Sequence, residues 1–292
     1  MSTQSVIHDL GYRGYDGPRL GVPAIARSLY ASGLRHAYGL GRSGRSKVLP
    51  FTLLAFALVP AAVMVGIMAM VPGFELPVGY ANYPTDTVSL LISVFAAAQA
   101  TVLFSRDLQH GSIVLYLARP LSSTLFAVVR WLSLTSAIAI FTLSPVLLLY
   151  VGGLLTRKDL ATHSAAFAKA ALAILLLSAM LAAITGVISS TSTRRGLAVV
   201  ISIAVLVVGG GVVDILRLLA ADRGSDTVAQ LVGLASPYSL YGGVAHLLDS
   251  GVAIGVPPEG VGVSLAYVAV AVAIPVLGLV FLVRRFAKVA SR

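Results

Sequence analysis

The stretch AAFAKAALAILLLSAMLAAITGVIS, residues Ala165–Ser189, decides the fold because it holds a single charged side chain, Lys169. As a helix it would be about 37 Å long. The hydrocarbon core of a bilayer is roughly 30 Å thick, so this stretch is long enough to cross it. Five other stretches are similarly apolar and are long enough, or nearly so, to do the same. The predicted spans are Val48–Val71, Val88–Phe104, Leu125–Val151, Ala165–Ser189, Gly196–Val213 and Val261–Val283.

The composition indicates an all-α integral membrane protein. Hydrophobic residues make up 58% of the chain and charged residues 11%, against about 25% charged in a soluble domain. There are no cysteines, which excludes disulfides and thiolate metal sites. The net charge of +10 is typical of nucleic-acid binding, but most basic residues flank the apolar segments. Membrane topology explains that placement better, so no nucleic-acid partner is predicted.

The distribution of Lys and Arg predicts the orientation. Basic residues are dense before the first span, between the second and third spans, between the fourth and fifth, and after the sixth. The opposite side keeps only Arg157, Lys158, Arg217 and Arg223 outside the spans. By the positive-inside rule, both termini are cytoplasmic. We therefore expect a cytoplasmic leader over residues 1–23 and a multi-pass transmembrane domain over residues 48–292.

Residues 24–47 read as an amphipathic elbow helix followed by a basic juxtamembrane linker. The apolar residues Ile25, Leu29, Tyr30, Leu34 and Ala37 share one half of a helical wheel, opposite Arg27, Ser28 and Arg35. Such a helix lies in the membrane interface, with its basic side toward anionic headgroups. The alternative is a solvated basic leader without a fixed conformation.

The external segment Asp214–Gly260 is too apolar for a free linker. It contains the short helical patterns DILRLLAA, VAQLVGLA and AHLLDSG, with a break at Ser236-Pro237. We expect short helices packed on the outer membrane face or dipping into it, where other protein groups or water satisfy their backbone.

Nucleotide-binding, metal-binding and catalytic motifs are weak. GLGRSGRS, Gly39–Ser46, nearly matches a phosphate-binding loop, but such a loop needs a strand before it. A basic elbow between two helices is the better interpretation. The five histidines are scattered without metal-ligand spacing, and no nucleophile elbow is present. No catalytic residue, cofactor or metal site is therefore predicted on this chain.

A few residues inside the spans qualify as pathway or hinge positions. Lys169 either reaches the membrane interface with its flexible side chain or contacts a substrate path. Pro145 predicts a kink in the third span. The glycines Gly209, Gly210 and Gly211 act as a hinge or as close-packing points, of which packing is the preferred interpretation.

The connector Ser105–Thr124, SRDLQHGSIVLYLARPLSST, lies on the cytoplasmic side and holds an apolar run from Ile113 to Ala118. Six helical residues span only about 9 Å and cannot cross the bilayer. A short helix here either lies on the membrane surface or sits in the groove of a soluble partner. In the second case Arg106, Asp107 and Arg119 stand at its rim.

The pattern RDLQHGSIVLYLARPLSSTLFAVVRW resembles the signature of ABC-2-type permeases, the membrane subunits of ATP-driven exporters. The matching positions are an acid, a glycine, the leucine that ends an apolar run, Arg-Pro, and a basic residue opening the third span: Asp107, Gly111, Leu117, Arg119, Pro120 and Arg130. The usual acid is Glu, so Asp107 departs from the pattern by one methylene. LASPYSLY, Leu234–Tyr241, is similar to a Ser-Pro element between the family's fifth and sixth spans. The leader Ile7–Gly21 looks like that of some actinobacterial permeases.

The resemblance implies a permease in a bacterial cell membrane that works with separate ATPase subunits and a second permease copy or paralogue, in contact with membrane lipids. ATP and Mg belong to the ATPase. The positions implied for coupling are Arg106, Asp107, Gly111, Leu117, Arg119 and Pro120, and spans one, two and five are expected at the dimer interface. The alternatives are a secondary carrier or channel and a non-transporting membrane anchor for a cytoplasmic complex. The transported substrate is not indicated.

Overall fold

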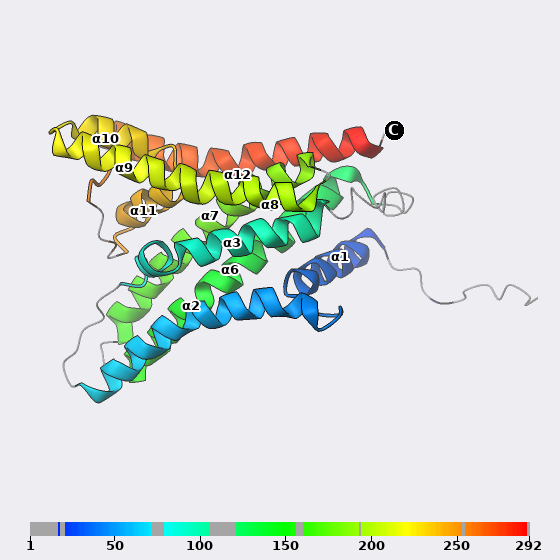
Figure 1. Cartoon of the computed structure of the whole chain (residues 1–292), viewed down its shortest axis with the longest axis horizontal. Coiled ribbons are helices and arrows are strands. Elements are labelled where there is room, and N and C mark those ends of the chain that lie inside the picture. The colour runs from blue at the N-terminus through cyan, green and yellow to red at the C-terminus, as the bar shows by residue number, and fades with distance from the viewer. Residues whose placement is uncertain are drawn as a thin grey trace, which may run out of the picture.

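The computed structural model describes residues 17, 21–71, 79–105, 121–155, 160–192, 194–250, 252 and 255–290. This part of the chain is helical with connecting turns and contains no strand, so the all-α prediction is confirmed for it. The helices form an elongated bundle (Figure 1). In chain order they are α1 (Val22–Ala37), α2 (Arg45–Met70), η1 (Tyr83–Thr87), α3 (Ser89–Ala100), η2 (Thr101–Ser105), α6 (Ser123–Leu155), α7 (Leu160–Thr191), α8 (Arg195–Ile203), η3 (Ala204–Val208), α9 (Gly209–Asp222), α10 (Asp226–Gly233), α11 (Pro237–Leu247) and α12 (Val261–Ala290), where η marks a π-helical segment.

Five helices are long and apolar enough to cross a membrane. They correspond to five of the six predicted spans and cover Arg45–Met70, Ser123–Leu155, Leu160–Thr191, Arg195–Asp222 and Val261–Val289. The remaining predicted span, Val88–Phe104, is a shorter apolar helix, Ser89–Ser105, made of α3 and η2. At about 1.5 Å per residue it is roughly 25 Å long, at the lower limit for a crossing.

The fifth predicted span lies within a longer helix. It was expected to end at Val213, before the charged Asp214, but helix continues through α8, η3 and α9 to Asp222. A charged side chain ends an apolar run without ending a helix. The helix stops at Gly224, whose φ of +70° suits glycine. There the N–H of Ser225 donates to Ala220 O at 2.9 Å and the N–H of Gly224 to Ala221 O at 2.9 Å, which is a Schellman cap.

Helices α6 and α7 form the centre of the bundle. About half of the most apolar window of each is buried, 50% and 56%, compared with 17% for α2. Phe95 of α3 stacks on Phe141 of α6 with ring centroids 4.4 Å apart. The outward surfaces of α2, α9 and α12 remain apolar and exposed, as lipid-facing surfaces are.

Helix α1 packs against α6. The Tyr30 hydroxyl donates to Ser136 Oγ at 2.8 Å, and the Tyr38 hydroxyl donates to Ala137 O at 2.9 Å. Leu29 and Ala37 are buried. The amphipathic helix expected here is therefore present, but protein covers much of the apolar face that was assigned to lipid.

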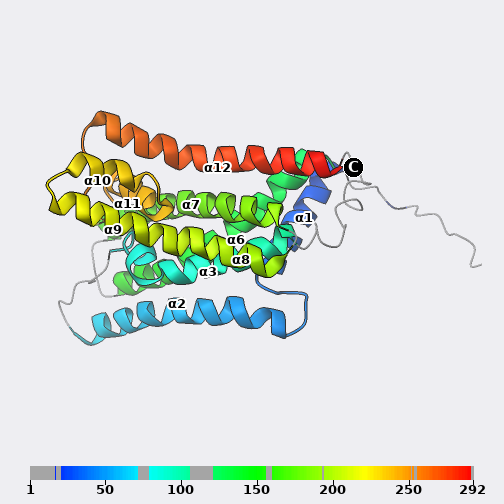
Figure 2. The ribbon, with the colours of Figure 1, turned by 45° about the horizontal axis from the view of Figure 1, so that its top comes forward.

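The bundle has two chemically different ends. Basic residues lie close to one end of the bundle, which we call the basic end. They are Arg45, Lys47, Arg130, Arg194, Arg195, Arg284, Arg285 and Lys288. Every acidic residue in the described ranges lies at the opposite end, the acidic end: Asp86, Asp214, Asp222, Asp226, Asp249 and Glu259. Figure 2 shows α1 and the C-terminus at the basic end, and α10 and α11 at the acidic end.

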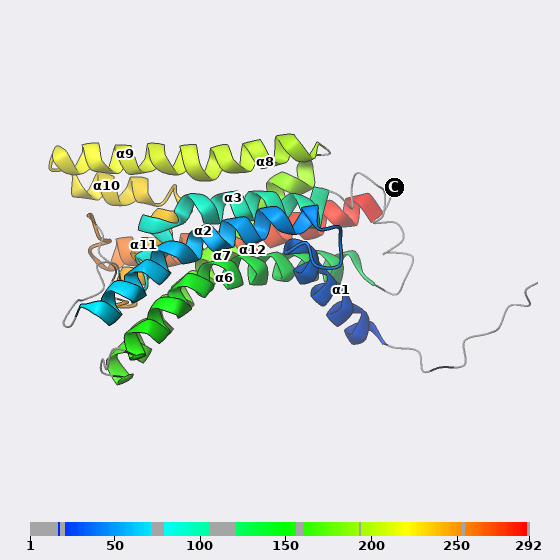
Figure 3. The ribbon, with the colours of Figure 1, turned by 60° about the horizontal axis from the view of Figure 1, so that its bottom comes forward.

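Prolines accompany the bends of two neighbouring helices. Pro145 lies inside α6, and Pro50 and Pro60 lie inside α2. Each removes one main-chain donor and crowds the preceding turn, which bends a helix. Figure 3 shows α2 and α6 bending along their length as they run beside each other. The kink predicted at Pro145 is compatible with this course of α6.

Packing between α7 and α12 depends on the absence of a side chain at Gly278. A Cβ added there would lie 2.7 Å from Ala183 Cβ and 3.4 Å from Ala183 Cα. Because Ala183 has no flexible side chain, Gly278→Ala must push α12 away from α7. We expect a loss of about 1–3 kcal/mol, measured as a lower unfolding temperature in detergent. At Gly66, where a Cβ would meet nothing within 4 Å, alanine should be neutral or stabilising. Equal unfolding temperatures for the two variants would contradict this packing.

Candidate functional site

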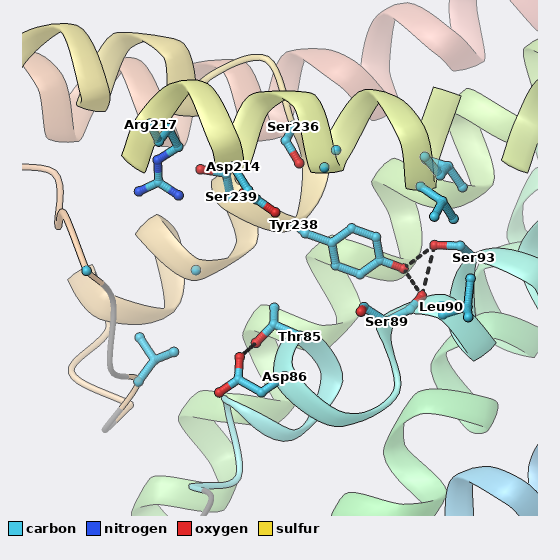
Figure 4. A pocket seen from close by; sticks show the side chains of 17 residues that line it. Thr85, Asp86, Ser89, Leu90, Ser93, Asp214, Arg217, Ser236, Tyr238 and Ser239 are labelled. Carbon is cyan, nitrogen blue, oxygen red and sulfur yellow. Dashed lines mark hydrogen bonds between the residues drawn. The ribbon is translucent and has the colours of Figure 1, made fainter. Parts of the chain in front are cut away.

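A polar pocket at the acidic end is the best-formed site among the described residues. Its volume is about 370 Å³, and its walls come from η1 and α3, from η3 and α9, from α11, and from the segment before α12. Figure 4 shows the labelled side chains converging from these elements. The polar and charged lining residues are Thr85, Asp86, Ser89, Ser93, Asp214, Arg217, Ser236, Tyr238 and Ser239.

Two serines give the pocket unused hydrogen-bonding groups. Ser236 and Ser239 are 1% and 6% exposed, and their hydroxyls have no hydrogen-bond partner in the described part of the chain. Ser236 is the N-cap of α11 but its side chain makes no capping bond, and Pro237 follows at the first helical position. Pro237 has no N–H and the Ser236 N–H donates to Gly233 O at 3.5 Å, so in the first turn of α11 only the N–H groups of Tyr238 and Ser239 have no partner within the helix.

Charged groups of both signs line the same pocket. Arg217 donates from Nη2 to Val256 O at 3.0 Å, whereas its buried Nε has no hydrogen-bond partner among the described residues. Asp214 lies one turn earlier on α9 and is exposed. Asp86 accepts from Thr85 Oγ1 at 2.9 Å and from Asn82 Nδ2 at 3.3 Å. Two carboxylates and one guanidinium leave the lining with a formal excess of negative charge.

Buried tyrosine hydroxyls fix the walls of the pocket. Tyr238 donates to Ser89 O at 2.8 Å and lies 2.7 Å from Ser93 Oγ, which ties α11 to α3. Tyr241 donates to Ala81 O at 2.7 Å, and Tyr267 donates to Gln230 O at 2.8 Å. Tyr238, Tyr241 and Tyr267 each donate to the main chain of another segment, so these bonds hold together the elements around the pocket.

If the basic end lies at one surface of the membrane, the pocket lies at the depth of the opposite surface. A helix rises about 1.5 Å per residue, which puts Asp214 roughly 28 Å from Arg195 along the same helix. That distance is close to the thickness of the hydrocarbon core. Asp214 and Arg217 therefore lie at the boundary between lipid and water, where charged side chains are tolerated.

The predicted coupling residues lie outside the described residues. Arg106, Asp107, Gly111, Leu117, Arg119 and Pro120 all fall within 106–120, and most of the leader Ile7–Gly21 is likewise outside. The residues on either side of this gap are described. Ser105 and Leu121 are both buried at the basic end, and Ser105 Oγ donates to Ser189 O of α7 at 2.7 Å.

Arginines contact the protein around this gap. Arg195 Nε donates to Thr101 Oγ1 of η2 at 3.3 Å, and Arg285 Nε donates to Ser190 O at 3.3 Å. Arg130 is 3% exposed and lies over the Phe126 ring, 5.4 Å from its centroid. The basic end is thus partly built into the packing of η2, α6, α7 and α12.

Lys169 holds the turn that follows α11. Its Nζ donates to both Oδ2 and the main-chain O of Asp249, each at 3.0 Å. Asp249 has a φ of +51°, a conformation that Asp adopts more readily than most residues. Lys169 does not line the polar pocket. Its observed partner is the carboxylate of Asp249 at the acidic end, which adds no support to a contact with a substrate path.

The glycine triplet does not pack closely within the described chain. A Cβ on Gly209 would meet only Ala204 O at 3.8 Å, and one on Gly211 would meet nothing within 4 Å. A Cβ on Gly210 would lie 3.7 Å from Ser236 Oγ, an ordinary contact. Gly210 and Gly211 instead line the pocket, directly after the π-helical turn η3. The close-packing interpretation therefore finds no contact to support it within the described chain, and the hinge stays a prediction.

This pocket was not predicted from the sequence. Asp214 was expected only as the first residue of the external segment Asp214–Gly260, and Ser236-Pro237 only as a break between helices. The available signals were Asp214 and Arg217 one turn apart on α9 and two serines flanking the start of α11. Gly39–Ser46, in contrast, lies between α1 and α2 with a helix before it, as the basic-elbow interpretation expects.

The described residues contain no group of three or more His, Asp or Glu placed to hold a metal ion. Comparison of the sequence with protein families and with curated proteins finds no match to either.

The ion pair between Lys169 and Asp249 predicts a pH effect. The hydrogen bond from Lys169, together with its charge, holds the pKa of Asp249 below its ordinary value of 3.8. The pair therefore stabilises the fold above pH 3.8, and this contribution is lost as the pH falls through the lower, folded pKa. Lys169→Met should return the pKa of Asp249 to its ordinary range in an NMR titration of labelled aspartate. Lys169→Arg should keep it low. An Asp249 pKa that does not change in Lys169→Met would contradict the pairing.

Proposed function

We propose that this chain is the permease subunit of an ABC-type exporter in a bacterial plasma membrane. In this proposal six helices cross the bilayer, with Ser89–Ser105 as the second span and α1 as the elbow helix. The basic end and both termini face the cytoplasm, in agreement with the positive-inside rule. Helices α10 and α11 lie on the external side, and a coupling helix lies within residues 106–120.

The observation that carries the proposal is the course of the helix Ser89–Ser105. Its last residue, Ser105, is buried at the basic end, directly before the segment that resembles the permease signature. Its first turn carries Ser89, Leu90 and Ser93, which line the polar pocket at the acidic end. One helix therefore connects the proposed ATPase-binding segment with a pocket that has charged walls of both signs.

A second helix follows the same route. Arg195 at the start of α8 is bonded to Thr101 of η2, and the same helix carries Gly210, Asp214 and Arg217 into the pocket. Both routes contain a π-helical turn, η2 in one and η3 in the other. A π-helical turn interrupts the regular main-chain hydrogen bonding of an α-helix, and such turns frequently occur at functional sites. A shift of residues 106–120 would thus reach the pocket along two helices.

The energy source is proposed to be an ATPase on a separate subunit. A proton-coupled carrier needs titratable groups along its path, whereas the described carboxylates all lie at the acidic end. Buried hydroxyls in the middle of α7 are bonded within their own helix: Ser178 Oγ donates to Ile174 O at 2.8 Å and Thr185 Oγ1 to Leu181 O at 2.7 Å. The exposed apolar sides of α2 and α9 offer surface for a second permease copy.

Charge reversal at Asp107 tests the ATPase partnership. Reversing one member of a charge pair at an interface costs about 2–5 kcal/mol. Asp107→Lys should therefore weaken association with the ATPase at least about tenfold, measured by copurification from membranes, while the chain still inserts.

The control for this experiment is Asp107→Glu, which keeps the charge and restores the usual acid of the resembled signature. It should retain the ATPase at the wild-type level. Equal recovery of an ATPase with Asp107→Lys would remove Asp107 from the interface. Solute transport by the purified chain without any ATPase would favour a secondary carrier, and the absence of any ATPase partner or transport would favour a membrane anchor.

A further inference from the structure

We infer that the polar pocket at the acidic end binds a zwitterionic group, an oxyanion next to an ammonium. The inference concerns binding by this chain alone and holds whether or not an ATPase is its partner. It starts from three buried donors of the pocket that have no partner among the described residues, and from two carboxylates that line the same pocket.

The oxyanion half is assigned to the start of α11. Ser236 and Ser239 present two buried hydroxyls without partners among the described residues, at the first turn of α11, where the N–H groups of Tyr238 and Ser239 have no partner within the helix. Helix N-termini favour negative charge because their N–H groups and the helix dipole point the same way. Buried polar groups are nearly always hydrogen-bonded, so two adjacent unused hydroxyls indicate a ligand or water at this point.

Arg217 adds a cationic donor to the same wall. A Cβ on Gly233 would lie 2.8 Å from Ser239 Oγ and 3.1 Å from Arg217 Nε, so both atoms lie beside this glycine, next to the Tyr267 hydroxyl. Arg217 is held in place by its bond to Val256 O. Its Nε and the Ser239 hydroxyl are both buried without a hydrogen-bond partner among the described residues, so each can donate to a bound acceptor.

The ammonium half is assigned to the carboxylates. Asp214 lines the pocket from α9, one turn before Arg217. Asp86 lines the opposite wall, with Thr85 and Asn82 donating to it. The two carboxylates outnumber the single guanidinium, so the pocket would repel a ligand that carries only a negative charge. A ligand that carries only a positive charge would leave the unpaired donors without an acceptor. A ligand with both charges can accept from the donors with its oxyanion and bind the carboxylates with its ammonium.

Two sources supply this chemistry, a zwitterionic phospholipid headgroup and a small soluble zwitterion. The pocket lies near the membrane surface, and the apolar residues Leu90 and Val207 also line it, so a headgroup with its acyl chains alongside fits the opening. Glycerophosphoethanolamine represents the soluble form, and phosphatidylethanolamine in nanodiscs represents the lipid form. N-acetylated phosphatidylethanolamine, which lacks the ammonium, is the matched control ligand.

The test uses the purified full chain without an ATPase. Calorimetry measures glycerophosphoethanolamine binding, and native mass spectrometry compares the two lipids. The double variant Ser236→Ala with Ser239→Ala should weaken binding about tenfold or more, because hydrogen bonds to charged groups are lost. Its unfolding temperature should not fall, because the removed hydroxyls have no partners within the chain. Asp214→Asn should also weaken binding, whereas Asp222→Asn, on the same helix but outside the pocket, should not.

Each outcome decides the inference. Binding of the soluble compound with this pattern of variants supports a soluble zwitterion, and binding of phosphatidylethanolamine alone with the same pattern supports a headgroup. Equal binding of the N-acetylated lipid overturns the ammonium half. Failure of both zwitterions to bind, or binding unaffected by the serine and Asp214 variants, overturns the inference as a whole. None of these results depends on the Asp107 experiment.

Discussion

The hydrocarbon core of a bilayer offers no hydrogen-bond partner, and this constraint shapes the whole chain. Every main-chain group in that region must be satisfied within the protein, which leaves helices as the structure for an apolar, cysteine-free sequence. Charged side chains are moved to the two ends for the same reason. The separation of basic and acidic ends follows directly, and the tyrosine, serine and threonine hydroxyls between them donate to nearby main-chain carbonyls.

The same constraint makes the polar pocket informative. At the acidic end, the side chains of Ser236 and Ser239 are buried without a partner, although Tyr238 between them is fully bonded. Arg217 Nε and the two serine hydroxyls gather in this pocket, while other buried hydroxyls without a partner among the described residues, such as those of Thr142 and Ser202, lie elsewhere in the bundle. The pocket also lies where the Ser89–Ser105 helix begins, so a molecule bound there would contact the element that continues toward the proposed ATPase-binding segment.

Much of the helical layout could be predicted from the sequence because hydropathy and length report directly on membrane crossing. The first span was expected at Val48–Val71 and the helix covers Arg45–Met70; the last was expected from Val261 and α12 begins there. The ends of the helices were harder to predict from the sequence, because hydropathy shows where contact with lipid ends and not where main-chain hydrogen bonding ends. Helix α9 therefore runs beyond Asp214 until Gly224 caps it.

The pocket could not be predicted because it exists only in three dimensions. Asp86, Asp214 and Ser239 are far apart in the sequence and meet through the packing of α3, α9 and α11. The amphipathic pattern of α1 was visible, but the pattern does not distinguish lipid from a neighbouring helix. Leu29 and Ala37 contact α6 because small residues there, such as Gly33 against Ser133, allow a close approach. The coupling positions stay a prediction, since residues 106–120 lie outside the described part.

The central claim is that the basic end faces the cytoplasm and the pocket faces outward, and the absence of cysteines makes it directly measurable. Single cysteines are introduced at Ile113 and at Ser225, the turn between α9 and α10, and intact cells are treated with a membrane-impermeant maleimide. The account predicts labelling at position 225 and protection at position 113 until the membrane is permeabilised. Labelling at position 113 with protection at position 225 would reverse the topology and contradict the account.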